Sequence, residues 1–232
     1  MKKELVKGLP YRMTPYAIFD LDGTLIDSMP YWEKIDIDLL TARGVQFDPV
    51  ATTEATKAMS IPEAIRYWQE HFGVRESVEE LSAEVGRRIC KAYAEDVPIK
   101  PHVYEYLDHL KEQGVRMCIA TSSQLEQVEV VMRRLDLWDR FEFVLTAPQV
   151  GRGKDFPDIY LEAARRMGAK PEECTVFEDT LAAVQTAAKA GFHTVAVADV
   201  CGAAAAEQIS AAAQCYVLDM GQLMERISDR PL

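Results

Sequence analysis

The chain has 232 residues, 48% of them hydrophobic, so it can bury a core in one large domain or in a core domain with a smaller insert. Its 26 basic and 37 acidic residues give a net charge of −11, which argues against nucleic acid and anionic membranes as partners. We find no signal peptide and no apolar stretch long enough to span a bilayer, and expect a cytoplasmic protein. Scattered cysteines predict buried thiols rather than disulfides at Cys90, Cys118, Cys174, Cys201 and Cys215.

An apolar run at residues 16–19 is followed at once by Asp20-Leu21-Asp22-Gly23-Thr24. The run predicts a buried strand, and its carboxyl end is where α/β sheets bind ligands. Two carboxylates crowded there raise each other's pKa unless a cation neutralises them, so the pair indicates a metal ion or a shared proton. The alternative is an Asp-Gly turn in which the aspartates only stabilise the bend.

The next segment, from about Ser28 to Val97, contains no convincing strand. Its spacing of apolar residues predicts amphipathic helices over 31–43, 62–72 and 78–94. Since the segment leaves just beyond the two aspartates and returns near Pro98, we interpret residues 28–97 as an all-helical cap domain over the active site. The core would then comprise residues 1–27 and 98–232. The alternative is that these helices pack on one face of the sheet.

The chain beyond residue 98 alternates between apolar runs typical of strands and the spacing of apolar residues typical of helices. Apolar, β-branched runs predict five further strands at 116–120, 143–146, 174–177, 194–197 and 215–218. Helical patterns lie between them at 103–113, 125–135 and 181–190, and an alanine-rich stretch at 203–213 predicts another helix. This alternation is typical of βαβ units, so we expect the α/β class with a mainly parallel sheet covered on both faces.

Polar residues follow four of the predicted strands, namely Asp20 and Asp22, Thr121 with Ser122 and Ser123, Lys154, and Glu178 with Asp179. Each group after the first has an ordinary structural explanation. The hydroxyls can cap the helix that follows, a loop lysine is usually solvated, and Asp179 can cap a helix. Together, the four carboxylates offer the hard oxygen ligands that suit Mg²⁺.

In content and order, these motifs resemble those of the haloacid dehalogenase superfamily, in its phosphatase and β-phosphoglucomutase-like branch with a helical C1 cap. The resemblance covers nearly the whole chain and implies a Rossmann-like parallel sheet core. It further implies that Asp20 is the nucleophile, forming an aspartyl-phosphate, and that Asp22 is the general acid/base. Thr121 and Lys154 would hold the transferring phosphoryl group.

The same resemblance implies a Mg²⁺ site formed by the Asp20 carboxylate, the Asp22 backbone carbonyl and Asp179. Glu178 would contribute through a water or by orienting its neighbours. Substrate contacts are expected from Ser122 in the core and from Trp32 and Met59 in the cap. For Trp32 the alternative is a place in the cap core.

The chain departs from the family pattern in several places. Asp155 follows Lys154 where relatives often have proline and could pair with it, and Ala183 stands where glycine is frequent. Trp32 occupies the position expected for a mutase histidine, and the loop at 58–62 lacks a basic residue for a second phosphate. These last two absences count against sugar-phosphate mutase activity.

We therefore expect a Mg²⁺-dependent phosphatase that binds neither nucleic acid nor a membrane and that acts as a monomer. Its substrate would be a small phosphomonoester: a sugar phosphate, another metabolite phosphate or a nucleotide. The alternatives are a phosphomutase of the β-phosphoglucomutase type and, from a different class, a non-catalytic binding or regulatory protein on the same scaffold. Phosphonoacetaldehyde hydrolase is a third enzymatic possibility, but the cap offers no clear Schiff-base lysine.

Overall fold

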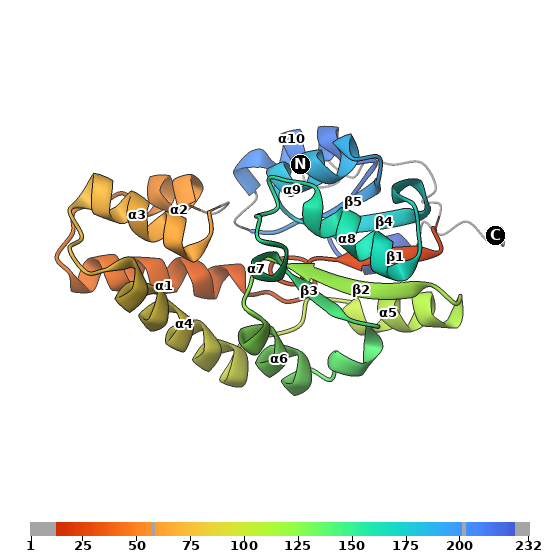
Figure 1. Cartoon of the computed structure of the whole chain (residues 1–232), viewed down its shortest axis with the longest axis horizontal. Helices are drawn as coiled ribbons and strands as arrows, with labels where there is room; N and C mark the ends of the chain where they lie inside the picture. The colour runs from red at the N-terminus through yellow and green to blue at the C-terminus, as the bar shows by residue number, and fades with distance from the viewer. Residues whose placement is uncertain (1–12, 57–58, 201–202, 226–232) are drawn as a thin grey trace.

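A computed structural model describes residues 13–56, 59–200 and 203–225. Six parallel strands form one sheet in the order β3-β2-β1-β4-β5-β6 (Figure 1). The strands are β1 (Tyr16–Phe19), β2 (Arg116–Thr121), β3 (Val144–Thr146), β4 (Cys174–Glu178), β5 (His193–Val197) and β6 (Cys215–Val217). All six predicted strands are present, and the α/β class is confirmed.

Helices cover both faces of this sheet, which explains why its strands are apolar on both sides. Phe19 and Ile119 pack toward α5 (Val103–Glu112), α6 (Leu125–Arg134) and α11 (Gly221–Met224). Ile18 and Val176 face the opposite way, toward α8 (Asp158–Met167) and α9 (Leu181–Lys189). Beyond α9, the helix α10 (Ala206–Ala212) covers the β6 side of the sheet. The alanine-rich stretch is thus helical, as predicted.

Four helices lie between β1 and β2 in the sequence, and Figure 1 shows them grouped beside the sheet. They are α1 (Met29–Ala42), α2 (Pro49–Thr56), α3 (Ile61–Phe72) and α4 (Val78–Glu95). We predicted three of them and missed α2. Its eight residues include three threonines and a valine, which have low helix propensity, and it is too short for a clear amphipathic period. The short helix α7 (Ala147–Val150) was missed for the same reason of length.

The two chain crossings that flank these helices lie side by side. The Asp27 amide donates to the Pro98 carbonyl at 2.9 Å, and the Lys100 amide donates to the Leu25 carbonyl at 2.9 Å. Helix α4 also packs against α6 of the sheet-containing part. The helices therefore leave and return through one paired crossing directly behind the first aspartate motif. The division at residues 28–97 stays a proposal.

The cysteines that the structure describes agree with the prediction of buried thiols. Cys118, Cys174 and Cys215 are buried and Cys90 is half-buried, and Cys90, Cys118 and Cys174 are free thiols. Cys201 lies outside the described residues. Within the described ranges, no helix is both long and apolar enough to cross a membrane.

Candidate active site

The predicted site residues meet at one edge of the sheet, at the carboxyl ends of its central strands. Asp20 follows β1, which lies between β2 and β4, and the Asp20 amide extends the sheet by donating to the Phe177 carbonyl at 2.9 Å. Thr121 ends β2 and Glu178 ends β4. Parallel strands end at a common edge, so the topology brings together residues that are more than 150 positions apart in the sequence.

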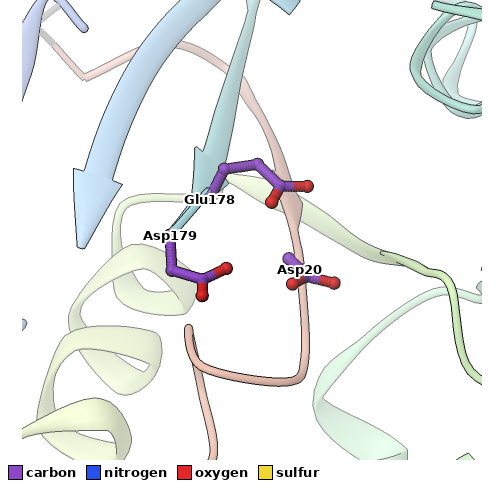
Figure 2. Close-up of side chains that lie close together, drawn as sticks. All are labelled: Asp20, Glu178 and Asp179. Carbon is purple, nitrogen blue, oxygen red and sulfur yellow. The ribbon is translucent and has the colours of Figure 1, made fainter. Parts of the chain in front are cut away.

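Three carboxylates converge there (Figure 2). One oxygen from each of Asp20, Glu178 and Asp179 lies within 4.8 Å of the others. The three residues are 7%, 1% and 5% exposed. Buried like charges at this separation repel strongly, so the cluster needs positive charge or protons to exist at neutral pH.

Part of that positive charge comes from Lys154, in the loop between α7 and α8. Its Nζ lies 2.5 Å from Asp20 Oδ1 and 2.6 Å from Glu178 Oε1. The lysine thus pairs with the two carboxylates across the site rather than with the adjacent Asp155. Glu178 Oε1 also accepts a hydrogen bond from the Tyr160 hydroxyl at 2.7 Å, a contact that sequence patterns did not predict.

One lysine does not neutralise three carboxylates, and the pKa values of Asp20 and Asp179 are raised. Burial, opposed by Lys154 and reinforced by Glu178, raises the pKa of Asp20 to about 8. Burial and the charges of Asp20 and Glu178 raise the pKa of Asp179 well above its usual range. For Lys154, burial lowers the pKa, but attraction to Asp20 and Glu178 raises it overall, so the ammonium stays charged. Asp20 and Asp179 would hold protons in the absence of a cation, and a divalent ion can take the place of those protons.

The backbone leaves room for this arrangement at Gly23. Its φ is +77°, a conformation that favours glycine, and a Cβ built there would lie 2.8 Å from Asp179 Cγ. A side chain at position 23 would therefore displace Asp179. Oxygen-only donors, their clustering and this cradle all fit Mg²⁺, which takes carboxylate ligands and retains several waters.

Asp22 lies outside the carboxylate cluster, because its side chain is engaged elsewhere. Its Oδ1 accepts hydrogen bonds from Ser28 Oγ at 2.6 Å, from Trp32 Nε1 at 3.3 Å and from the Tyr93 hydroxyl. Its Oδ2 accepts one from Ser123 Oγ at 2.8 Å. Trp32 belongs to α1 and Tyr93 to α4, so helices from both ends of the inserted segment contact this one carboxylate.

The other predicted residues lie in less defined places. Thr121 is fully buried, and its hydroxyl accepts the Ser123 amide at 3.1 Å. Ser122, which we expected to contact substrate, is exposed, whereas its neighbour Ser123 makes the contact with Asp22. Met59 is 37% exposed and lies two residues before the first residue of α3. Among the hydrogen bonds of the described residues, Trp32 alone of the three residues expected to contact substrate bonds to a predicted catalytic residue, Asp22.

A second lysine, Lys100, binds the loop that carries Asp20 and Asp22. Lys100 Nζ donates to the Gly23 carbonyl, to the Ala198 carbonyl at 2.9 Å and to Asp199 Oδ2 at 2.8 Å. All three ammonium protons are thereby used, so this lysine is a structural support and not a free cation. It ties the aspartate loop to the end of β5 and was not predicted.

Comparison with known proteins gives a consistent picture. A family model of haloacid dehalogenase-like hydrolases matches residues 15–191. Hexitol phosphatase B of Escherichia coli is 32% identical over 168 residues, which are 71% of this chain and 75% of the relative. A phosphorylated carbohydrates phosphatase of Thermotoga maritima is 28% identical over 181 residues, 77% of this chain and 82% of the relative.

Solved structures share the fold at lower identity. CbbY from Rhodobacter sphaeroides, a mutant in complex with xylulose bisphosphate, has a TM-score of 0.80 at 21% identity, covering 90% of this chain and 96% of that one. A hydrolase from Pseudomonas syringae has a TM-score of 0.78 at 24% identity, with coverages of 93% and 98%. The family model spans most of the chain and includes every carboxylate of the cluster, so this protein belongs to the haloacid dehalogenase-like hydrolases.

Proposed function

We propose that the protein is a Mg²⁺-dependent phosphatase that hydrolyses a small phosphomonoester through an aspartyl-phosphate on Asp20. The observation that carries the proposal is the buried cluster of Asp20, Glu178 and Asp179, two of which, Asp20 and Glu178, pair with the Lys154 ammonium. A phosphate dianion and a carboxylate nucleophile repel each other, so the reaction needs concentrated positive charge at the nucleophile. Asp20 and Asp179 would hold the ion, with Glu178 and the Asp22 backbone carbonyl as further ligands or supports, and the ion would neutralise charge on the phosphoryl oxygens.

In the first step, an Asp20 oxygen attacks phosphorus and the bond from phosphorus to the ester oxygen breaks. Asp22 gives a proton to that oxygen, so the product leaves as an alcohol. In the second step, water attacks phosphorus, its proton returns to Asp22, and the bond between Asp20 and phosphorus breaks. Inorganic phosphate is released and both aspartates regain their starting state. Lys154 and the Thr121 hydroxyl hold the phosphoryl group during both steps.

For the substrate, we propose a phosphorylated sugar or sugar alcohol. The support comes from the named activities of relatives, the hexitol phosphatases and the phosphorylated carbohydrates phosphatase. Trp32 and Met59 in the cap, and Ser122 in the core, are the proposed contacts with the non-phosphate part. A single phosphate requires no second basic site, whereas a mutase must bind a bisphosphate, so the lack of a basic residue in the cap loop at 58–62 favours hydrolysis.

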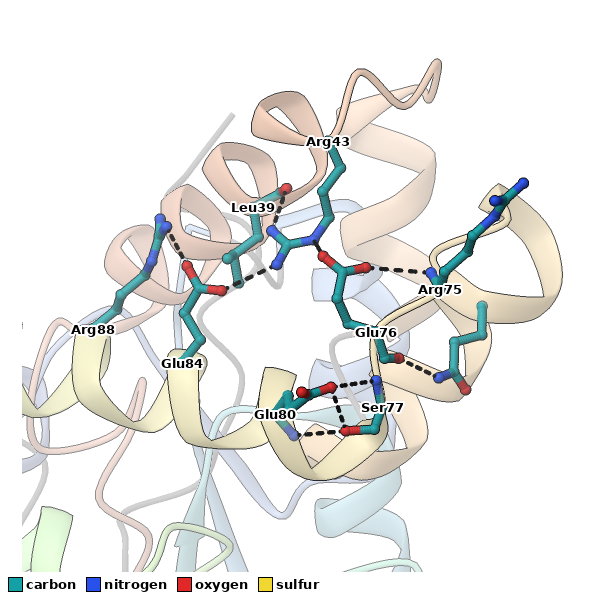
Figure 3. A network of polar contacts seen from close by, with 9 residues as sticks. Leu39, Arg43, Arg75, Glu76, Ser77, Glu80, Glu84 and Arg88 are labelled. Atoms are coloured by element: carbon teal, nitrogen blue, oxygen red, sulfur yellow. Dashed lines mark hydrogen bonds and ion pairs between the residues drawn. The ribbon is translucent and has the colours of Figure 1, made fainter.

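The proposed cap is internally braced, as a specificity element should be if its side chains are to hold a fixed geometry. Figure 3 shows Arg43 at the end of α1 bound to Glu76 and Glu84, which precede and lie within α4. The N–O distances are 2.7 Å and 3.1 Å. Arg43 also donates to the Leu39 carbonyl at 2.9 Å. We propose that the braced helices move as one unit over the sheet edge, opening for substrate and closing to exclude water.

The decisive test is a hydrolysis screen across sugar phosphates, sugar-alcohol phosphates, nucleotides and other phosphorylated metabolites, with and without Mg²⁺. We expect Mg²⁺-dependent release of inorganic phosphate, strongest with a sugar or sugar-alcohol phosphate, and none from Asp20→Asn. Mass spectrometry of acid-quenched protein should find the phosphoryl group on Asp20. Isomerisation of a sugar phosphate without phosphate release would favour the mutase. A folded protein that turns over nothing but binds a phosphorylated ligand would favour the regulatory alternative.

A further inference from the structure

The four hydrogen bonds to Asp22 are divided unequally between its two oxygens. Oδ1 accepts three, from Ser28, Trp32 and Tyr93, whereas Oδ2 accepts one, from Ser123. A carboxylate oxygen has about two lone pairs, so three donors saturate Oδ1. Oδ2 keeps a lone-pair direction open. A proton can therefore reach Asp22 at Oδ2 without displacing any of these donors.

The two aromatic donors are built into one unit. The rings of Trp32 and Tyr93 pack edge to face, with centroids 6.5 Å apart and an interplanar angle of 83°. Both polar groups of this pair meet the same oxygen. Tyr93 is fully buried, and its hydroxyl meets Asp22 as a donor. A phenol carries its proton at neutral pH, so it can make this bond to a carboxylate.

The backbone of Tyr93 is also held by a hydrogen bond. Arg134 on α6 donates through Nε to the Tyr93 carbonyl at 2.6 Å, and the same guanidinium binds the Val97 carbonyl. The end of α4 is thus held against a helix that packs directly on the sheet. This attachment gives the Tyr93 hydroxyl a defined position relative to the strand ends.

We propose that Tyr93, supported by Trp32, is a positioning residue for Asp22, holding Oδ1 so that Oδ2 is the oxygen that exchanges protons during catalysis. The inference rests on the proposed function, in which Asp22 protonates the leaving oxygen and later accepts a proton from water. Tyr93 touches neither substrate nor phosphorus and acts only through Asp22. The alternative is that the Tyr93 hydroxyl donates to Asp22 only because a buried hydroxyl needs a hydrogen-bond acceptor, as buried tyrosines usually do.

The test compares Tyr93→Phe with the parent on two substrates, the best alkyl phosphate from the screen and p-nitrophenyl phosphate. The constant kcat/KM reports the steps up to formation of the aspartyl-phosphate. An alkoxide needs a proton to leave, whereas nitrophenolate does not. General acid catalysis contributes roughly a hundredfold to ten-thousandfold, so we expect partial misplacement of Asp22 to lower kcat/KM about tenfold or more on the alkyl phosphate. The loss on p-nitrophenyl phosphate should be clearly smaller.

A matched control is Tyr104→Phe. It removes a hydroxyl that donates to the Leu135 carbonyl, with an O–O distance of 2.6 Å, and that does not contact Asp22. This variant should keep the parental kcat/KM on both substrates. Should Tyr93→Phe fail to fold, as judged by circular dichroism, Ser28→Ala removes another donor to the same oxygen and should show the same dependence on the leaving group.

A double-mutant cycle separates the two proposals. If Tyr93 acts through Asp22, the variant carrying both Tyr93→Phe and Asp22→Asn should lose no more than Asp22→Asn alone. Equal losses on the two substrates, additive losses in the double variant, or parental rates in folded Tyr93→Phe would overturn the positioning role. Parental activity in Asp22→Asn on the alkyl phosphate would instead overturn the proposed function of Asp22.

Discussion

Gly23 offers a sharp test of the carboxylate cluster, because one added methyl group should affect both folding and metal binding. The residue has φ of +77°, and its Cβ would lie 2.8 Å from Asp179 Cγ and 3.2 Å from Met29 Cγ. Placing an L-residue in the left-handed region costs roughly 1–2 kcal/mol. In Gly23→Ala the contact with Asp179 adds to this cost, since carbon atoms do not approach so closely without one of them moving. We expect the Asp179 side chain to rotate away from the cluster.

Gly168→Ala isolates the backbone contribution. Gly168 has φ of +70° at the end of α8, and no atom lies within 4 Å of the Cβ it would gain. For a chain of this size, 1 kcal/mol corresponds to about 2–4 °C in Tm, so the strain alone should lower Tm by roughly 2–8 °C. Gly23→Ala should lower Tm at least as much. It should also raise the Mg²⁺ concentration that gives half-maximal activity, whereas Gly168→Ala should leave that concentration unchanged.

Calorimetric titration with Mg²⁺ measures the same effect without turnover. The reasoning would be refuted by a folded Gly23→Ala that binds Mg²⁺ as tightly as the parent. It would also be refuted by a rise in the half-saturating concentration of equal size in Gly168→Ala, because that would trace the effect to general destabilisation.

Three further predictions concern two carboxylates of the site and one carboxyl group on α1. Asp20→Asn should abolish turnover while leaving Tm near or above the parental value in the absence of metal, since it removes the nucleophile at nearly constant volume; near-normal activity would exclude the proposed mechanism. Asp179→Ala should raise the half-saturating Mg²⁺ concentration about tenfold or more, and an unchanged value would remove it from the metal site. Burial and the charge of Glu33 raise the pKa of Asp36 from 3.8 to about 7. The folded state therefore holds that proton where the unfolded state has lost it, and the free energy of unfolding should fall as pH rises from about 4 through about 7. Asp36→Asn should lack this fall, so denaturant unfolding at pH 5 and pH 8 should show it gaining stability relative to the parent at the higher pH.

The strands could be predicted from the sequence because the signal for each is local. Runs such as 174–177 are short, apolar and β-branched, and each is bounded by turn residues. The polar residues at their ends were found for the same reason. The helix α2 was not, since its threonines and its short length give no periodic pattern. Local patterns thus predict elements that are long or strongly apolar and miss those that depend on their neighbours.

The contacts that orient the site lie beyond local patterns. Tyr93 and Asp22 are 71 positions apart, and Tyr160 and Glu178 are 18 apart. A tyrosine at a buried helical position is explained equally well by core packing, so nothing in the sequence distinguishes these two from Tyr106, which lies in the core under the sheet. The resemblance to a family indicated the residues proposed to bind phosphate, whereas the residues that contact and orient them were found only from the structure.

These supporting contacts change how the inserted helices should be tested. Deletion of residues 29–96 would remove Trp32 and Tyr93 together, and with them two of the four donors to Asp22. Loss of activity in such a variant would then follow from a misplaced general acid as readily as from lost substrate recognition. Lys100 must also be retained, because its side chain binds the Gly23 carbonyl in the aspartate loop. Substitutions at Met59, which carries none of these contacts, therefore test the role of the cap in specificity more cleanly than removing the cap.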